Sequence, residues 1–138
     1  MNDFPCTALQ FHPKVVSFPH LGASTSQSEE NCAVMVATQL KEFIETGNIR
    51  NAVNFPEVSM PWTQGERLSI VNQNIPNMVG QITSVLGEHN INVIDLINKS
   101  KGDIAYTMID TEQVIADDLL AKISDISGII SARKISRA

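Results

Sequence analysis

The sequence predicts an α+β fold of the ferredoxin-like type, preceded by a strand and loop and by one long helix. Two observations lead to this prediction. Over residues 67–135, apolar alternation and helical spacing follow one another in the order β-α-β-β-α-β. Before them, residues 26–46 carry a single helical pattern that stops at Gly47. We therefore expect residues 65–138 to form a four-stranded antiparallel sheet with two helices on one face.

Local signals place each element of this second half. Pro76 ends the first strand, and Asn77 has a short acceptor side chain suited to a helix N-cap. Gly102 supplies the turn of a hairpin, and Gly128 ends the last helix. In order, we expect strand 67–73, helix 78–89, strand 91–98, turn 99–103, strand 104–110, helix 114–126 and strand 129–135. The second sheet face and the sheet edges remain uncovered in this arrangement, so we expect a homo-oligomer.

The first 64 residues read as a separate region that ends in a linker. Residues 14–18 favour a short strand, and Ser26 with Glu29 forms a capping box at the start of the long helix. Residues 48–61 contain two prolines and no clear period, so we expect a connector. One face of the long helix is apolar, and we expect it to be buried between protomers: Ala33, Val36, Leu40, Phe43 and Ile44.

Composition limits the classes of function. The net charge of −5 argues against a nucleic-acid partner, because no basic patch is present to meet phosphates. No apolar run approaches the length of a membrane span, and the N-terminus does not resemble a signal peptide. The two cysteines have no metal-like spacing. We expect a cytoplasmic protein without a metal.

The turn between the first strand and the first helix of the second half is the candidate site. It presents backbone N–H groups at a helix N-terminus, where a carboxylate binds favourably. Three asparagines surround it in the sequence: Asn72, Asn74 and Asn92. Their amides can donate and accept hydrogen bonds to a small polar molecule. Alternatively, they only satisfy backbone groups of turns and strand ends.

These motifs resemble two parts of a known family. The stretch from Asn74 to Gly80, together with Ile91–Val93, resembles an ACT domain, a module that senses small molecules in amino-acid metabolism. The stretches Pro19–Thr25, Ser28–Asn31 and Ala52–Val58 resemble the C-terminal part of D-3-phosphoglycerate dehydrogenase. The resemblance covers nearly the whole chain. It implies a truncated remnant of the catalytic region over residues 1–64 and an ACT regulatory domain over residues 65–138.

The resemblance implies that the domain senses L-serine, or a similar small amino acid, for feedback control of serine biosynthesis. The ligand would lie at a dimer interface, where the turn of one domain meets the second strand of its partner. The implied ligand-binding residues are Asn72, Asn74, Pro76, Asn77, Met78, Val79 and Asn92. Asn72 stands where the best-known serine-sensing members carry a histidine, which leaves the identity of the ligand open.

The resemblance does not make this chain an enzyme on its own. NAD is the cofactor of the full-length family, but the chain has no GxGxxG turn to bind it. His20 matches the family's acid/base histidine, while the family's catalytic arginine and glutamate lie upstream of the residues present. We therefore expect His20 to be vestigial and no cofactor to bind. Two alternatives stay open: a ligand-free oligomerisation module, and a part of the NAD-dependent dehydrogenase that supplies His20 to a separate catalytic body.

Overall fold

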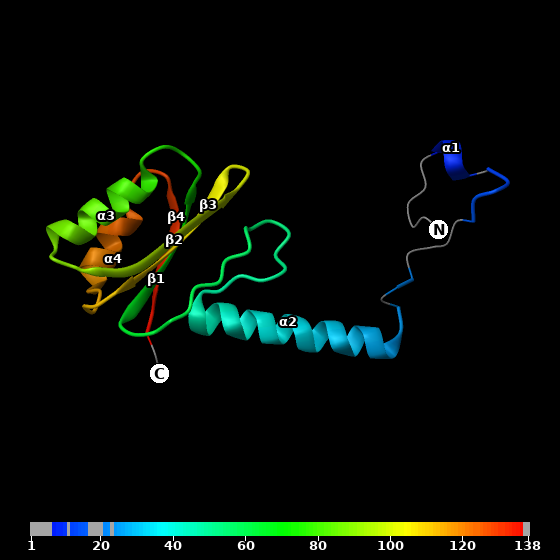
Figure 1. Cartoon of the computed structure of the whole chain (residues 1–138), viewed down its shortest axis with the longest axis horizontal. Helices are drawn as coiled ribbons and strands as arrows, with labels where there is room; N and C mark the ends of the chain where they lie inside the picture. Colours follow the sequence, from blue (N-terminus) through cyan, green and yellow to red (C-terminus); the bar gives the residue numbers. More distant parts are fainter. Residues whose placement is uncertain (1–6, 11, 17–20, 23, 137–138) are drawn as a thin grey trace. The chain divides into compact units, whose positions relative to one another are not determined.

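The computed structural model describes residues 7–10, 12–16, 21–22 and 24–136. The chain divides into two compact units, residues 1–38 and 39–138. The second unit contains the complete sheet (Figure 1) together with residues 39–64, which the sequence analysis placed in the preceding region. Within the described residues, no helix combines the length and apolar character that crossing a membrane requires.

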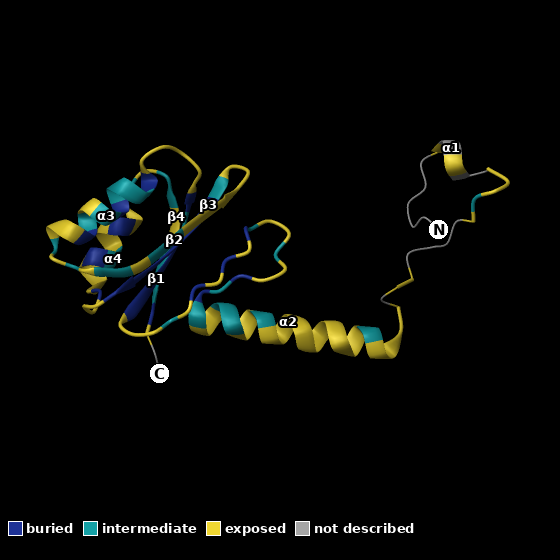
Figure 2. Cartoon of the chain, in the orientation of Figure 1, coloured by how far each residue is buried: buried dark blue, intermediate teal, exposed yellow. Residues whose placement is uncertain are grey.

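The long predicted helix is confirmed as α2, Ser26–Thr46, and a short helix α1, Thr7–Gln10, precedes it. The predicted cap was wrong by one residue, because Ser26 is already helical and the Thr25 Oγ1 atom accepts the N–H of Ser28 at 3.1 Å. None of the described side chains of α2 is buried, so the apolar face that we expect to pack between protomers is exposed on the single chain over most of the helix (Figure 2). Lys14–Val16 form a turn and irregular backbone, not a strand, and residues 17–18 lie outside the described part.

The second half has the predicted ferredoxin-like topology. Its elements are β1 (Glu66–Gln73), α3 (Met78–Glu88), β2 (Val93–Lys101), β3 (Ile104–Thr111), α4 (Asp117–Ser124) and β4 (Ile129–Ile135). The strands lie in the order β2-β3-β1-β4, and every neighbouring pair is antiparallel. The hairpin turn is tighter than predicted, since β2 continues to Lys101 and β3 begins at Ile104.

Helices α3 and α4 cover one face of the sheet (Figure 1). Between them and the sheet lies the first core, formed by Leu68, Ile70, Ile82, Leu86, Ile109, Ile115, Leu119 and Ile123. Helix α4 is shorter than the predicted 114–126, yet Ile115 is fully buried in this core. The Ile115 N–H donates to a carboxylate oxygen of Glu66 at 2.5 Å instead of starting a helix. Ile115, Leu119 and Ile123 thus all lie in the first core although the helix begins only at Asp117.

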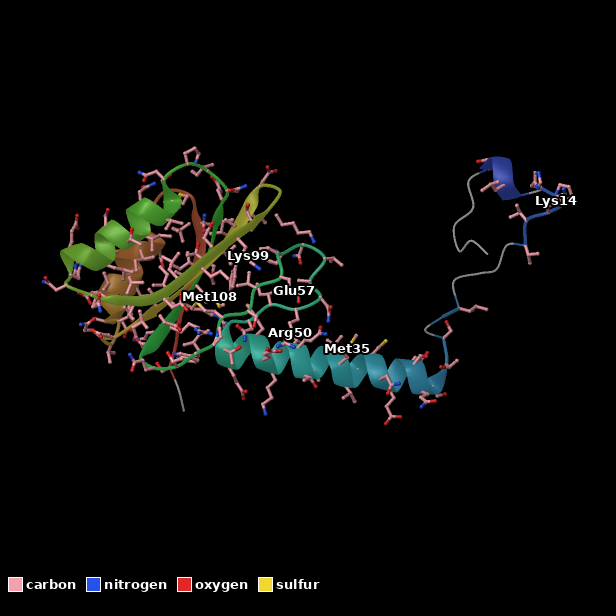
Figure 3. All side chains as sticks on the ribbon, in the orientation of Figure 1. Lys14, Met35, Arg50, Glu57, Lys99 and Met108 are labelled. Carbon is pink, nitrogen blue, oxygen red and sulfur yellow. The ribbon has the colours of Figure 1, made fainter. Side chains whose placement is uncertain are left out.

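The other face of the sheet is covered by the chain's own residues, which corrects the prediction of an open face. Residues 48–61, predicted to be a connector, fold back through a bridge between Ile49 and Val58. A second core forms here from Ile49, Val58, Met60, Tyr106 and Met108. Lys99 on β2 also reaches this segment (Figure 3), because its Nζ atom donates to the carbonyl oxygen of Glu57 at 3.1 Å.

A buried ion pair joins this segment to the sheet. Arg67 on β1 donates to the two carboxylate oxygens of Asp110 on β3, at 2.6 and 2.7 Å. A third guanidinium nitrogen donates to the carbonyl oxygens of Thr46 and Met60, at 2.9 and 3.1 Å. The Arg67 side chain is fully buried and lies 4.9 Å from the centre of the Trp62 ring. One guanidinium thus holds the end of α2, residues 60–62 and two strands together.

The only tyrosine of the chain makes a second polar link on this face. The Tyr106 hydroxyl donates to the carbonyl oxygen of Gly47, at 2.7 Å, and lies 2.7 Å from the Ser69 Oγ atom. Burial raises the pKa of Tyr106 above 10.0, partly offset by the hydrogen bond with Ser69 and the charge of Arg133. Gly47, where α2 ends as predicted, has a left-handed backbone with φ of 76°.

We expect the protein to lose stability at alkaline pH through Tyr106. Its folded pKa lies above the unfolded value of 10.0, so the folded state retains a proton that the unfolded state releases. The stability that the protonated Tyr106 contributes is fully present below pH 10.0 and is lost as pH rises through the folded pKa of Tyr106. Tyr106→Phe should cost about 1–3 kcal/mol at pH 8, because the Gly47 carbonyl loses its donor. Urea unfolding of both proteins at about pH 8 and about pH 11 measures the difference.

The change in stability between these two pH values should be smaller in Tyr106→Phe than in the wild type. Lysines also titrate in this range, but they are common to both proteins and cancel in the comparison. An equal loss of stability in the two proteins would show that Tyr106 does not carry the alkaline sensitivity.

Candidate functional site

The candidate site is the turn that leads from β1 to α3. The N–H of Ile75 donates to the carbonyl oxygen of Gln73 at 2.9 Å, which folds a three-residue turn with Asn74 at its centre. Asn74 ties this turn to the β2–β3 hairpin. Its backbone N–H donates to the Asp103 carbonyl at 2.8 Å, and its side-chain Nδ2 donates to the Gly102 carbonyl at 3.0 Å.

The start of α3 differs from the predicted cap. Asn77 has a left-handed backbone with φ of 67°, and its side chain makes no capping hydrogen bond. The amide side chain instead lies over Gly80, where an added Cβ would come within 2.3 Å of the Asn77 Oδ1 atom. A larger residue at position 80 would therefore require the exposed Asn77 side chain to move. The first N–H groups of an α-helix have no partner within the helix, and no side chain caps them here.

The other residues predicted for this turn are near one another but differ in exposure. Pro76 and Asn77 are exposed, Val79 is half-buried and Met78 is buried. Ile75, which the prediction did not include, is 46% exposed and lies against the same part of the turn as Met78, since both side chains approach Gly128. The surface offered to a ligand is therefore the polar turn with an apolar side wall.

Asn72 is placed behind the turn and not on its surface. Its side chain is 1% exposed. The Oδ1 atom accepts the hydroxyl of Thr107 at 3.2 Å, and the Nδ2 atom donates to the Gln73 carbonyl at 2.7 Å. Both ends of the amide are engaged, and a ligand on the surface has no access to either end in this conformation.

Asn92 lies at the opposite end of the sheet from Asn74. It directly precedes β2, whose first residue, Val93, pairs with Thr111. Asn74 directly follows β1, whose last residue, Gln73, pairs with Ile104. These two ends are seven register positions apart along β3, which corresponds to about 23 Å at the usual rise of a strand. One chain therefore brings Asn72, Asn74 and residues 76–79 together but leaves Asn92 apart.

Sequence reasoning missed several groups of this site. Asp103 and Gly102 hold the turn through backbone carbonyls, which have no signature in the sequence. Thr107 is one of two threonines in β3, and only the structure shows that it meets Asn72. His20 lies outside the described residues. Among the residues that the structure describes, no group of three or more His, Cys, Asp or Glu side chains is arranged to hold a metal ion.

Comparison with known proteins gives relatives named D-3-phosphoglycerate dehydrogenase. The chain is 31% identical over 134 residues to D-3-phosphoglycerate dehydrogenase of Haemophilus influenzae, covering 96% of this chain and 33% of the enzyme. It is 32% identical over 121 residues to D-3-phosphoglycerate dehydrogenase of Escherichia coli, covering 86% of this chain and 30% of the enzyme. D-3-phosphoglycerate dehydrogenase 1 of Saccharomyces cerevisiae is 34% identical over 112 residues, covering 78% of this chain and 24% of the enzyme. No protein-family model matches the chain.

Solved structures with a similar arrangement include ACT domains. The ACT domain from GTP pyrophosphokinase of Chlorobium tepidum is 19% identical with a TM-score of 0.45, covering 53% of this chain and 100% of that domain. The regulatory subunit of aspartate kinase from Thermus thermophilus is 13% identical with a TM-score of 0.44, covering 51% of this chain and 50% of that subunit. The fold assignment itself rests on the strand order and pairing given above. The relatives from Haemophilus influenzae and Escherichia coli confirm the predicted resemblance to D-3-phosphoglycerate dehydrogenase. The chain spans about a third of the length of each of these two enzymes.

Proposed function

We propose that this chain is a regulatory region of a D-3-phosphoglycerate dehydrogenase and that its ACT domain binds L-serine, or a similar small amino acid, between two copies of the chain. The observation that carries the proposal is the turn at Asn74, an exposed polar loop at an uncapped helix N-terminus on a domain related to these enzymes. An α-carboxylate suits the amides at the start of α3, and the Asn74 amide suits a hydroxyl or an ammonium group.

The distance between Asn74 and Asn92 favours a site shared by two chains. At about 23 Å, these side chains cannot contact one small amino acid within a single chain. Pairing of two β2 edges around a two-fold axis removes this separation. If the axis passes through Ile97, Asn92 lies opposite the partner's Gly102, because the two residues are equally far from Ile97 in the strand. Gly102 is the residue whose carbonyl accepts the Asn74 side chain.

The charges on β2 favour the same register. Asp95 and Lys99 are equally far from Ile97, so Asp95 of each chain lies opposite the partner's Lys99. Both side chains are exposed on the described chain. With the second sheet face already covered, the sheet edges at β2 and β4 remain for a partner, and the charge pairing favours β2. Pairing of this kind gives two equivalent ligand sites per dimer.

In a complete dehydrogenase, L-serine at this interface would slow catalysis by favouring one arrangement of the domains. This coupling requires that the ligand bind the two arrangements with different affinity. The proposed role of this chain is regulatory, and NAD and the substrate would bind to parts of the longer enzyme. In this proposal His20 has no catalytic role in the isolated chain.

Calorimetric titration of the full chain with L-serine tests the proposal, with glycine, L-alanine and D-serine as ligand controls. We expect saturable binding of L-serine, weakened by about 1–3 kcal/mol in Asn74→Ala because polar groups of the ligand lose their partner. Asn54→Ala is the matched control, since Asn54 is also an exposed asparagine in a loop but belongs to the segment on the other sheet face. It should bind L-serine like the wild type.

Mixing two variants that each bind L-serine weakly tests whether two chains share the site. Asn74→Ala and Asn92→Ala should each bind weakly alone, whereas the mixed dimer contains one site with both asparagines intact. Unfolding and refolding the mixture should therefore restore tight binding at about a quarter of all sites. No restored binding would contradict the shared site. A dimer with no heat from any amino acid would instead identify a ligand-free oligomerisation module, and co-purification of a nucleotide-binding protein would favour supply of His20 in trans.

A further inference from the structure

We infer that Thr107 and Asn98 are positioning residues of the proposed ligand site, acting on the Asn74 turn through Asn72. This inference rests on the proposed function, because it concerns the same site. It changes the role of Asn72 from the ligand contact implied by the resemblance to a support behind the turn.

A continuous row of hydrogen bonds crosses three strands below the turn. The Asn98 Nδ2 atom on β2 donates to the Thr107 hydroxyl on β3 at 2.7 Å. The Thr107 hydroxyl donates to the Asn72 Oδ1 atom on β1 at 3.2 Å, and the Asn72 Nδ2 atom donates to the Gln73 carbonyl at 2.7 Å. Each member except the last acceptor is a side chain. We call Asn98, Thr107 and Asn72 the polar row.

The polar row sets the orientation of a buried amide. Asn72 and Thr107 are 1% and 0% exposed, so neither can replace a lost protein partner with bulk water. Because Asn98 donates to the Thr107 oxygen, the single hydroxyl proton of Thr107 is left for Asn72. That proton selects the Oδ1 atom of Asn72 and turns Nδ2 toward Gln73. Asn98 therefore determines, through Thr107, which end of the Asn72 amide faces the turn.

The row ends on the carbonyl that folds the ligand turn. The Gln73 oxygen accepts the Asn72 side chain and also the N–H of Ile75, at 2.9 Å. The peptide group that carries this oxygen also carries the N–H of Asn74, which donates to Asp103. If Asn72 lost its orientation, the Gln73–Asn74 peptide would lose one of its restraints. The position of the Asn74 side chain would then be less well defined, and the ligand would bind more weakly.

The row begins on the strand that the proposal pairs with a second chain. Asn98 is next to Ile97, the residue through which the two-fold axis of the proposed dimer passes. Its backbone is at the edge of the sheet and the residue is exposed, while its side chain donates to the buried Thr107 hydroxyl. The row therefore connects the pairing edge of β2 to the turn at the end of β1 through side chains alone.

Thr107→Val tests this role, with two companion variants. Valine keeps the branched shape of threonine and removes the hydroxyl, whereas Thr107→Ser keeps the hydroxyl. Thr111→Val is the matched control, because Thr111 is a fully buried threonine on the same face of β3, and its hydroxyl lies 3.0 Å from the Gln113 carbonyl at the opposite end of the strand. All are studied in the full chain by calorimetry with L-serine and by NMR hydrogen exchange without ligand.

In Thr107→Val, the Asn72 side-chain NH2 and the Asn74 backbone N–H should exchange about tenfold faster, and the Kd for L-serine should rise about tenfold. Thr107→Ser should restore both values. Thr111→Val should lower the melting temperature without changing either. Unchanged Asn74 exchange and unchanged L-serine affinity in Thr107→Val would overturn the inference. If exchange responds as expected but the wild type binds no amino acid, the polar row stands and the proposed function fails.

Discussion

Replacing Asp110 by alanine should destabilise the protein by about 3–5 kcal/mol, the usual cost of leaving a buried charge without its partner. Arg67 is fully buried and would keep its positive charge, with only the carbonyls of Thr46 and Met60 and the face of Trp62 in contact. These groups are dipoles, and they do not neutralise a guanidinium. Because a domain has only about 5–15 kcal/mol of stability, this one change should remove a large share of it.

Urea unfolding at neutral pH measures the effect, and two further variants interpret it. The double variant Arg67→Met with Asp110→Leu removes both charges and should recover most of the lost stability. Asp117→Ala removes an ion pair of similar length, 2.6 Å to Lys134, but the Asp117 side chain is 88% exposed, so it should have little effect. Near-equal losses in Asp110→Ala and Asp117→Ala would contradict a special role for the buried pair.

This ion pair also shows where prediction from the sequence ends. The alternation of Leu68, Ser69 and Ile70 was sufficient to predict β1 and the side that faces the helices. It gave no indication that Arg67, at the start of that strand, is buried. A charged residue at a strand end normally faces water, and its burial depends on a partner 43 positions away. Only the pairing of β1 with β3 brings Asp110 to it.

The covered second face could not be predicted for a related reason. Residues 48–61 have neither helical nor strand period, which is correct, since they form only an isolated bridge, bends and irregular backbone. A periodic sequence pattern predicts only regular helices and strands. This segment is held instead by individual buried side chains such as Val58 and Met60 and by the hydrogen bonds of Arg67. The inference of an open face followed from treating an irregular segment as an unpacked one.

At the candidate site, local chemistry was predictable and register was not. Pro76 and the asparagines predicted the turn and its polarity. The engagement of Asn72 by Thr107, and the separation of Asn74 from Asn92 along the sheet, both follow from which residues pair across strands. A short pattern of single residues contains no information on that pairing. The same limit applies to the cap of α2, where Thr25 and Ser26 are chemically equivalent and the backbone selects Thr25.

Gly65→Ala is the second change for which we expect a large effect, about 2–5 kcal/mol. Gly65 has a left-handed backbone with φ of 76°, which costs about 1–2 kcal/mol for alanine. A Cβ atom at this position would also come within 1.9 Å of the Thr111 carbonyl oxygen. Backbone atoms cannot move aside like the end of a side chain, so β1 would shift relative to β3 at additional cost of about 1–3 kcal/mol. The shift would begin two residues before Arg67, and it would strain the buried ion pair as well.

Gly102→Ala separates the two causes. Gly102 also has a left-handed backbone, with φ of 61°, but no neighbouring atom lies within 4 Å of an added Cβ. This variant should therefore show the conformational cost alone, and the difference between the two midpoints in urea gives the cost of the close approach to Thr111. Equal losses would mean that β1 can move away from β3 at Gly65 without penalty.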